Sequence, residues 1–366
     1  MDLLRRLVAQ GIGSSVFLAA ACSGSSSAPP SASPDAAATS AVPLDAAPDA
    51  LASPDAPPRA DASPPIAGSF LFGVESLSAK LDTAPSSAEN QAALAVVERE
   101  LRATYVKIRL TAQPTEPFTS RSCQPDCFDL DATVRLFKEK GWSMVPMISA
   151  PAGPGVTSVD VGRYVRFVEW FLTRYRDDAK VEYLELVNNP AGPGWRGTDD
   201  DLLAIQNGVY ERVHAGFPGV KVGTHGVEMF ADSTGPEATR QLQILELLLD
   251  GARGARFDFL AFHGYKPLGD DGPYPPTRST LHNRFAPIEG ILELRRRLDA
   301  NGWGDRGLLD TESTYMSPLE TLSSWGETSA ALMAQSLVRK RALLSNGKPA
   351  LLGALPLKVS PRCEPA

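Results

Sequence analysis

The sequence predicts an α/β fold in which eight parallel strands close into a (β/α)8 barrel, also called a TIM barrel. The first observation is an alternation, from about residue 70 onward, between short runs rich in branched and aromatic residues and longer helical patterns. The second is length, because residues 66–366 form one globular segment that suits a single barrel better than two domains. An open, doubly wound sheet built from the same units is the alternative.

Each predicted strand is short and largely apolar, as expected for a parallel sheet that is covered on its outer face by helices. Pro146 is unusual in the third run, because proline cannot donate a backbone hydrogen bond to a neighbouring strand. The eight runs are residues 70–74, 105–110, 143–148, 181–187, 220–224, 257–263, 307–312 and 350–355.

The segments between these runs carry helical patterns. Gly141 stops one of them, and acidic residues from Asp199 open another. The helices are predicted at residues 88–103, 130–140, 161–175, 199–215, 237–249, 288–298 and 330–344. No helical pattern follows the eighth run, so we expect either a barrel that is shortened at this end or a truncated gene product.

The N-terminal segment predicts export. Arg5 and Arg6 precede an apolar stretch that is too short and too rich in glycine and serine to span a membrane. The stretch ends Leu-Ala-Ala-Ala-Cys at residues 18–22, which resembles a bacterial lipobox. Residues 1–21 are therefore predicted to be a lipoprotein signal peptide and Cys22 to carry the lipid. An ordinary secretory signal cut nearby is the alternative.

Residues 22–65 are predicted to be a disordered linker. They consist mostly of serine, alanine, proline and aspartate, and Arg59 is their one basic residue. Such a segment has too little apolar surface to offset the entropy of ordering it, so it would tether the barrel to a membrane surface. Ser23 and Gly24 give no acidic retention signal after the cysteine, so the outer membrane is the expected destination.

Charge gives no indication of a nucleic-acid partner. The formal net charge is −7, and the basic clusters at 295–297 and 339–341 fall in predicted helices, where a solvated face explains them. The sequence contains no phosphate-binding loop, dinucleotide motif or zinc-binding histidine pair, so no cofactor or metal is predicted.

Cys123 and Cys127 lie in a turn-rich segment. In the oxidising compartment that export implies, two cysteines at this spacing predict a small loop closed by a disulfide. A metal site is the alternative, with less support, because the sequence has no second cysteine pair and no close histidine pair.

Polar residues gather where the predicted strands end. In a (β/α)8 barrel the active site is built from the carboxyl ends of the strands and the loops that follow them. Several consecutive strands contribute to this set, which strengthens the expectation of a site, although strand ends are generally more polar than strand middles. The residues are Glu75, Arg109, Asn188, Asn189, His225, Glu228, His263, Tyr265 and Glu312.

Two of these strand ends resemble the catalytic strands of the retaining glycoside hydrolases built on this barrel, a clan that includes many cellulases, mannanases and β-xylosidases. In that family the fourth strand ends Asn-Glu-Pro, with the glutamate as general acid/base, and the seventh ends in the nucleophilic glutamate. The matching segments here are Asn188-Asn189-Pro190 and Asp310-Thr311-Glu312. The resemblance implies that Glu312 is the nucleophile, that Asn188 binds the sugar 2-hydroxyl, and that Asn189 replaces the acid/base.

Three further residues match the family pattern. His263 and Tyr265 are similar to a sixth-strand His-x-Tyr, which implies that the tyrosine bonds the nucleophile and the histidine lines the sugar subsite. Arg109 matches a second-strand arginine that lowers the pKa of the nucleophile by its charge. The alternative for Arg109 and Glu312 is a purely structural ion pair, and for His263 a satisfied histidine at a strand end.

The fourth strand leaves two other assignments open. Trp195 follows it directly and is placed either to stack on a sugar ring or to anchor the loop. The Asn-Asn-Pro segment would also suit a simple turn. His225 follows the fifth strand and is a further candidate for substrate binding.

Compared with that family, this sequence lacks the glutamate that acts as general acid. Asn189 cannot hold or release a proton near neutral pH, and loss of general acid catalysis costs roughly 10²–10⁴-fold in rate. Glu185 is expected to lie too deep in the barrel to replace it. Glu228 and Glu75 are on the right face, and Glu228 is the better candidate because its loop neighbours the end of the fourth strand.

Three functions follow from these residues. The first is an exported, lipid-anchored glycosidase that acts on β-linked polysaccharide or oligosaccharide with Glu312 as nucleophile. The second is an inactive member of the family that binds carbohydrate without cutting it. The third is a scaffold or interaction protein that uses the barrel for neither purpose.

Overall fold

The computed structural model describes residues 70–355 with several gaps. The predicted signal peptide, the lipidation site Cys22, the linker and Tyr265 lie outside the described residues. The gaps fall at residues 76–93, 101, 124–126, 152–157, 193–194, 229–235, 265, 268–285, 314, 317–336, 339 and 346–347.

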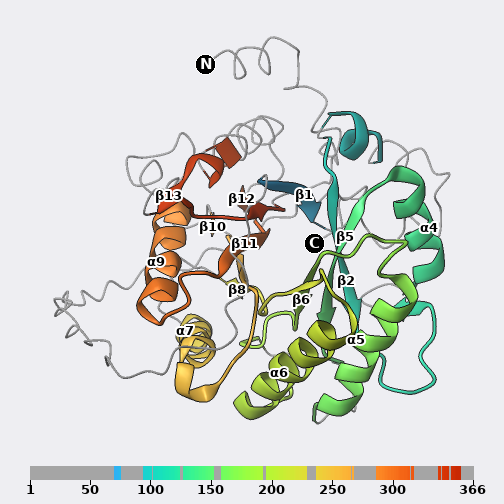
Figure 1. The fold of residues 1–366 in the computed structure, drawn as a ribbon, viewed down its shortest axis with the longest axis horizontal. Helices are drawn as coiled ribbons and strands as arrows, with labels where there is room; N and C mark the ends of the chain where they lie inside the picture. The colour runs from blue at the N-terminus through green and yellow to red at the C-terminus, as the bar shows by residue number, and fades with distance from the viewer. Residues whose placement is uncertain are drawn as a thin grey trace, which may run out of the picture.

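Eight parallel strands form the centre of the protein, and the predicted (β/α)8 barrel is confirmed (Figure 1). The sheet order is β7-β6-β5-β2-β1-β15-β11-β9-β8, and β7 and β8 are two parts of one strand. The strands are β1 (Leu71–Glu75), β2 (Tyr105–Thr111), β5 (Ser143–Ser149), β6 (Tyr183–Leu186), β7 (Lys221–Val222) with β8 (Val227–Glu228), β9 (Phe259–His263), β11 (Gly307–Glu312) and β15 (Gly353–Ala354).

The ring closes between the strand formed by β7 and β8 and its two neighbours. β7 pairs with β6, and β8 pairs with β9. Between them Gly223 forms a parallel bridge with Phe259, and Asp258 N donates to Val222 O over 2.7 Å. Because both ends of the sheet meet in this run, the open, doubly wound alternative is wrong.

The helices surround the strands, as Figure 1 shows. α4 and α5 have the predicted end points, and α6, α7 and α9 lie within two residues of theirs at each end. Capping residues fix two of these ends: the Asp160 side chain accepts from Arg163 N at the start of α5, and Gly141 adopts the left-handed conformation after α4. The longer α-helices in the described ranges are α4 (Leu130–Lys140), α5 (Val161–Tyr175), α6 (Asp199–Gly216), α7 (Pro236–Leu249) and α9 (Ala286–Ala300).

Two predicted helices are described only in part. Of the range 88–103, residues 94–95 are α-helical and η1 (Val96–Glu100) is a short π-helix. Of the range 330–344, residues 337–338 and 340–342 are helical. The predicted end at residue 344 is wrong, because Leu344 pairs with Pro349 in a short antiparallel hairpin. The prediction that no helix follows β15 concerns residues 356–366, which lie outside the described residues.

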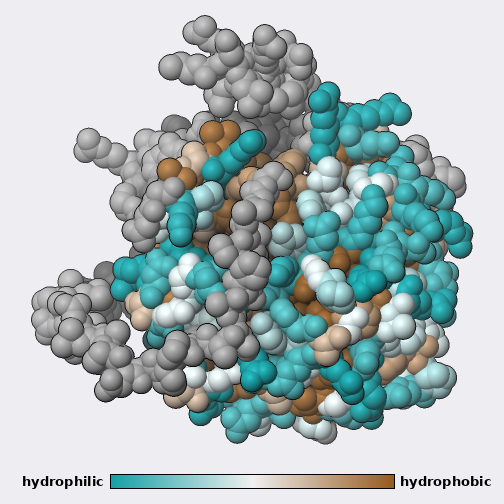
Figure 2. All heavy atoms as spheres, viewed as in Figure 1, coloured by the Kyte–Doolittle hydropathy of each residue, from teal (hydrophilic) through white to brown (hydrophobic). Residues whose placement is uncertain are grey.

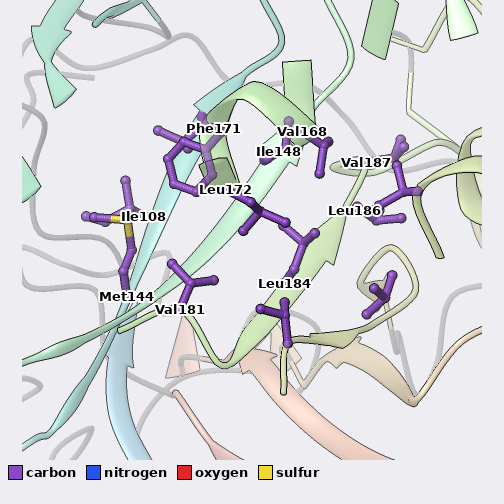
Figure 3. Close-up of a cluster of buried hydrophobic side chains, with 14 of the residues drawn as sticks. Ile108, Met144, Ile148, Val168, Phe171, Leu172, Val181, Leu184, Leu186 and Val187 are labelled. Atoms are coloured by element: carbon purple, nitrogen blue, oxygen red, sulfur yellow. The ribbon is translucent and has the colours of Figure 1, made fainter. Parts of the chain in front are cut away.

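Alternation along the strands separates an outer core from the barrel interior. The outward residues of β2, β5 and β6 pack against α5, and Figure 3 shows Ile108, Ile148 and Leu184 in one cluster with Phe171 and Leu172. Inside the barrel a smaller apolar layer forms a floor. Its buried members are Leu71, Val145, Phe259, Ala261, Leu309 and Leu355.

Short elements outside the barrel were not predicted. An antiparallel hairpin of β3 (Arg121–Cys123) and β4 (Cys127–Asp129) places Cys123 opposite Cys127 in register. The side chains of both cysteines lie outside what the structure describes, so the disulfide stays a prediction. The remaining elements are β10 (Lys266–Pro267), β12 (Tyr315–Met316), β13 (Leu344–Ser345), β14 (Lys348–Pro349) and η2 (Gly251–Arg253).

The visible outer surface is mainly hydrophilic, with smaller hydrophobic areas between the polar side chains (Figure 2). This agrees with helices whose apolar sides face the barrel. No helix in the described parts of the chain has the length and apolar character needed to cross a membrane.

Candidate functional site

A β-bulge in β11 turns Glu312 into the barrel. Leu309 faces the inner apolar floor and Leu308 the outer core, so strict alternation would send Glu312 outward. The register shifts, however: Asp310 pairs with Phe262 and Glu312 with His263, which leaves Thr311 as an extra residue. Bulges of this kind re-aim side chains next to active sites.

Asp310 holds the outer side of the same bulge. Its Oδ2 contacts the buried ammonium of Lys340, which belongs to the helical residues 340–342, and accepts a hydrogen bond from Ser313 Oγ over 2.8 Å. Lys340 Nζ also donates to Ser313 Oγ over 3.1 Å. The bulge is therefore supported by a buried ion pair on one side while Glu312 faces the other.

Glu312 receives three nitrogen groups on one carboxylate oxygen. Its Oε2 lies 3.0 Å from Arg109 Nη2, 3.4 Å from Lys107 Nζ and 3.8 Å from His263 Nε2. Burial alone raises the pKa of the Glu312 carboxyl, but His263, Lys107 and Arg109 together lower it below its ordinary value. The carboxylate is thus held ionised at neutral pH, as a nucleophile requires.

A second carboxylate, Glu185, lies deeper in the barrel. Its side chain is fully buried; its Oε2 is 3.0 Å from Lys107 Nζ, and its Oε1 is 3.2 Å from His263 Nε2. Burial alone raises the pKa of Glu185, but Lys107 and His263 bring it down to about 2. A group that is ionised at the working pH and closed off from solvent cannot deliver a proton to a leaving group.

Lys107 is the residue of this cluster that the sequence analysis missed. It is buried on β2 with 1% of its surface exposed, two positions before Arg109. Residues two apart on a strand face the same side, so the prediction for Arg109 already implied an inward Lys107.

His225 lies in the run between β7 and β8 and is buried beside the same cluster. Neither ring nitrogen has a hydrogen-bond partner among the described residues. Burial, and next the charge of His263, lower the pKa of His225 to about 3, so the ring is neutral at pH 7. Gly226 is a tight fit here, because a Cβ on it would lie 2.0 Å from His263 Nε2.

The chain after β6 is held in unusual backbone conformations. Val187 and Asn189 have positive φ angles of 46° and 40°, and positive φ is rare for a β-branched residue such as valine. Asn189 Oδ1 accepts a hydrogen bond from Gln241 Nε2 of α7 over 3.0 Å. Gly192 packs on the Asn189 amide, since a Cβ on Gly192 would lie 2.8 Å from Nδ2. Backbone strain of this kind concentrates at functional sites.

The two neighbours of Asn189 are placed differently. Asn188 is half-buried in a bend directly after β6. Trp195 is also half-buried; it packs against the outer core, its backbone N–H donates to Gly192 O over 3.2 Å, and its ring covers Gly197. Trp195 therefore anchors this loop, and its stacking on a sugar stays a prediction.

Glu228 lies on the same row of strand ends as the cluster. Its Cα is in register with His263, whose partner on the other side is Glu312. The backbone thus brings these three strand ends together, while the Glu228 side chain and the whole of Tyr265 lie outside what the structure describes.

At the described strand ends, the carboxylate of Glu312 is partly accessible to a ligand and is held by the cationic side chains of Arg109 and Lys107. Exposure falls from 36% for the Arg109 side chain to 10% for that of Glu312 and 1% for that of Lys107. Among the described residues no group of histidine, cysteine, aspartate and glutamate side chains could hold a metal ion. The arrangement can bind a polar ligand and offer it a carboxylate. Among the described side chains, the second carboxyl group of the cluster is that of Glu185, which is buried and ionised.

Comparison by sequence finds no family model and no curated protein that matches this chain. Comparison by structure does find matches. A glucosidase from Croceicoccus marinus is 18% identical with a TM-score of 0.54, and the match covers 81% of this chain and 62% of that one. The chain therefore spans less than two thirds of the length of the glucosidase.

Two further glycoside hydrolases have similar scores. A bacterial orthologue of human α-L-iduronidase is 14% identical with a TM-score of 0.52, covering 81% of this chain and 49% of that one. The GH53 catalytic domain of Ignisphaera aggregans is 13% identical with a TM-score of 0.51, covering 81% of this chain and 87% of that one. At such identities the likeness concerns the fold alone: this protein has the (β/α)8 barrel fold that these glycoside hydrolases share.

Proposed function

We propose that this protein cleaves β-linked oligosaccharides or polysaccharides by a retaining mechanism in which Glu312 is the nucleophile. The observation that supports the proposal is the Glu312 carboxylate itself. It lies at the carboxyl end of β11, is turned inward by the bulge, and is kept ionised by Arg109 and Lys107. Strand ends at this face carry the active site in barrels of this fold.

In the proposed reaction Glu312 attacks the anomeric carbon while the bond to the leaving oxygen breaks. The product is a glycosyl ester on Glu312, which a water molecule then hydrolyses, so two inversions give net retention. Arg109 and Lys107 hold the Glu312 carboxylate through its Oε2 and disfavour its protonation. His263 lies against the same carboxylate and completes its contacts.

The leaving oxygen needs a proton when the leaving group is a sugar. Asn189 cannot supply it, and Glu185 is buried and ionised. Glu228 and Glu75 are the remaining candidates among the predicted residues, and the register of Glu228 with His263 favours Glu228. We therefore expect substrates with good leaving groups to react much faster than plain disaccharides.

A panel of fluorogenic aryl β-glycosides tests the proposal, because these leaving groups depart with little acid assistance. At least one sugar should be turned over, and Glu312→Gln should reduce turnover to background. Glu211→Gln is the matched control, since Glu211 pairs with Arg256 on the exposed side of α6. Absence of turnover with every sugar, or full turnover by Glu312→Gln, would contradict the proposal.

A carbohydrate-binding protein without hydrolytic activity is the second candidate. The amide of Asn189, held by Gln241 in the place where a glycosidase of this kind carries its acid, favours it. This candidate requires binding of the full chain to a glycan array together with no turnover, and weaker binding after Trp195→Ala. A protein that neither binds nor cleaves any glycan would instead be a scaffold built on the barrel.

We also propose that the protein is exported and anchored by lipid at Cys22, with the outer membrane as its site. The lipobox-like segment at 18–22 and the abrupt change to a Ser/Ala/Pro/Asp-rich linker support this. A linker of this composition would hold the barrel away from the membrane surface, within reach of polymeric substrates.

A further inference from the structure

Lys107 contacts two carboxylates from two different strands. Its Nζ lies 3.0 Å from Glu185 Oε2 on β6 and 3.4 Å from Glu312 Oε2 on β11. We infer that Lys107 is a positioning residue whose ammonium group holds Glu312 in its reactive state, and that Glu185 is the fixed counter-ion of Lys107 rather than a second reacting carboxyl. This inference rests on the proposed function and adds two residues to its site.

Lys107 and Glu185 are both buried side chains. Side-chain exposure is 1% for Lys107 and 0% for Glu185. A buried charge without a partner costs several kcal/mol, so both ions need each other. Lys107 lies beside the apolar floor, because Val145, its register partner on β5, belongs to that floor. The sequence therefore keeps two costly ions at a place where apolar residues would pack.

Lys107 contacts Glu312 in addition to Glu185. A lysine that served only to neutralise Glu185 would need no contact with a second carboxylate. Lys107 instead donates a hydrogen bond to Glu312, and His263 also lies between the two carboxylates, at 3.2 Å from Glu185 and 3.8 Å from Glu312. Any change in the charge of Lys107 or Glu185 therefore acts on Glu312.

Among the described side chains, the charges that act on Glu312 come from three strands. Lys107 and Arg109 project from β2, Glu185 from β6 and His263 from β9, while the neutral His225 lies beside them. Glu75 and Glu228 share these strand ends by register. His263, Lys107 and Arg109 favour the ionised form of Glu312, and Glu185 opposes it.

This balance predicts shifts of opposite sign from two substitutions. Lys107→Met removes an attractive charge, so the pKa of Glu312 should rise by about one unit or more. Glu185→Gln removes a repulsive charge, so the pKa of Glu312 should fall. Lys107→Arg keeps the charge and should stay near the wild type. Damage to packing alone would not move one variant up and the other down.

The test reads the ionisation of Glu312 directly. The full chain is labelled with ¹³C at glutamate side-chain carboxyls, the Glu312 signal is assigned by its loss in Glu312→Gln, and its pH midpoint is measured for each variant. Lys138→Met is the matched control, because Lys138 forms an exposed ion pair with Asp178 on the outside of the barrel. That control should leave the midpoint unchanged.

Folding of Lys107→Met is a risk, since it leaves Glu185 short of a partner. The double variant Lys107→Met/Glu185→Gln removes both charges together and is compared with Glu185→Gln alone. Loss of Lys107 in that background should still raise the midpoint of Glu312. Equal midpoints in the two proteins, or shifts of the same sign in the two single variants, would overturn the inference.

The inference and the proposed function fail in different ways. If the aryl glycosides are hydrolysed, the acid limb of kcat/KM should follow the same shifts as the carboxyl signal. If no glycoside is hydrolysed but the carboxyl shifts appear, the proposed hydrolysis is wrong and the role of Lys107 in setting the state of Glu312 stands. If hydrolysis occurs and the shifts are absent, only the role of Lys107 is wrong.

Discussion

Arg109 Nη2 lies 3.0 Å from Glu312 Oε2, and this ion pair joins β2 to β11 across 203 residues of chain. It is the outermost contact in a series that continues inward through Lys107 to Glu185. The site therefore has an accessible end, where Glu312 can contact a ligand. Its other end is buried, and the charges of Lys107 and Glu185 there influence the ionisation of Glu312.

Removing the outermost contact should affect Glu312 more than stability. Arg109→Met takes away one of the charges that lower the pKa of Glu312, so the acid limb of kcat/KM should move to higher pH by about one unit. The free energy of unfolding near neutral pH should fall by about 1.4 kcal/mol at most, the equivalent of one pKa unit, because the Arg109 side chain is 36% exposed and solvent screens the pair. Arg212→Met, at an exposed pair with Glu169, is the control that should leave both quantities unchanged.

Restoring a carboxyl group at position 189 should restore acid assistance. In Asn189→Glu the new side chain stands next to Gln241 Nε2, which already donates to the residue at this position. Hydrolysis of substrates with poor leaving groups should rise by about 10²-fold or more, whereas activated aryl glycosides should gain little. Asn189→Gln has the same length without the proton, and an equal gain in that variant would rule out acid catalysis as the cause.

The buried pair of Lys107 and Glu185 should make the protein sensitive to acid. The pKa of Glu185 is about 2 in the folded protein and 4.5 is its ordinary value. Because the folded pKa is the lower one, the stabilisation is complete above pH 4.5 and is lost as pH falls from there toward 2. Its size is on the order of 3 kcal/mol.

Chemical denaturation of the wild type and Glu185→Gln at several pH values measures this effect. The difference in the free energy of unfolding should be about 3 kcal/mol at pH 7 and should shrink toward pH 2. Glu211→Gln, at an exposed pair, should show a difference near zero throughout. A difference for Glu185→Gln that does not depend on pH would mean that its carboxylate is not stabilised as described.

The alternation of runs was enough to predict the barrel from sequence. Each strand contributes inward and outward residues in turn, and the helical segments carry local end signals such as Gly141 and the Asp160 cap, so α4 and α5 were placed correctly at both ends. The hairpin of β3 and β4 was missed, because strands of three residues have no periodicity to detect. The bulge at Thr311 depends on the register with β9, which no local pattern encodes.

The sequence predicted those residues of the candidate site that lie at the carboxyl ends of strands. The carboxyl ends of parallel strands lie at one face, so Arg109, His263 and Glu312 were expected together and are in contact. Lys107 was overlooked because a lysine in an apolar run reads as a solvated residue. The state of Glu185 follows from that lysine, since its burial was predicted but its partner was not.

The predicted lipid anchor has its own test. Cys22→Ser should move the protein from the membrane fraction to the soluble fraction, because a multiply acylated cysteine is what would hold it stably. Mass spectrometry of the wild type should find lipid on Cys22 and no residues before it. A substituted protein that still sediments with membranes, or an unmodified Cys22, would contradict the predicted lipid anchor.

The most direct test of the central claim is to trap the covalent intermediate on Glu312. A 2-deoxy-2-fluoro glycoside with an activated leaving group, of the sugar preferred in the aryl glycoside panel, slows both steps and lets the glycosyl ester accumulate. Peptide mass spectrometry should find one sugar on the peptide that contains Glu312, and none in Glu312→Gln. A label on another residue, or hydrolysis by the wild type without any adduct and undiminished in Glu312→Gln, would contradict the assignment of Glu312 as nucleophile.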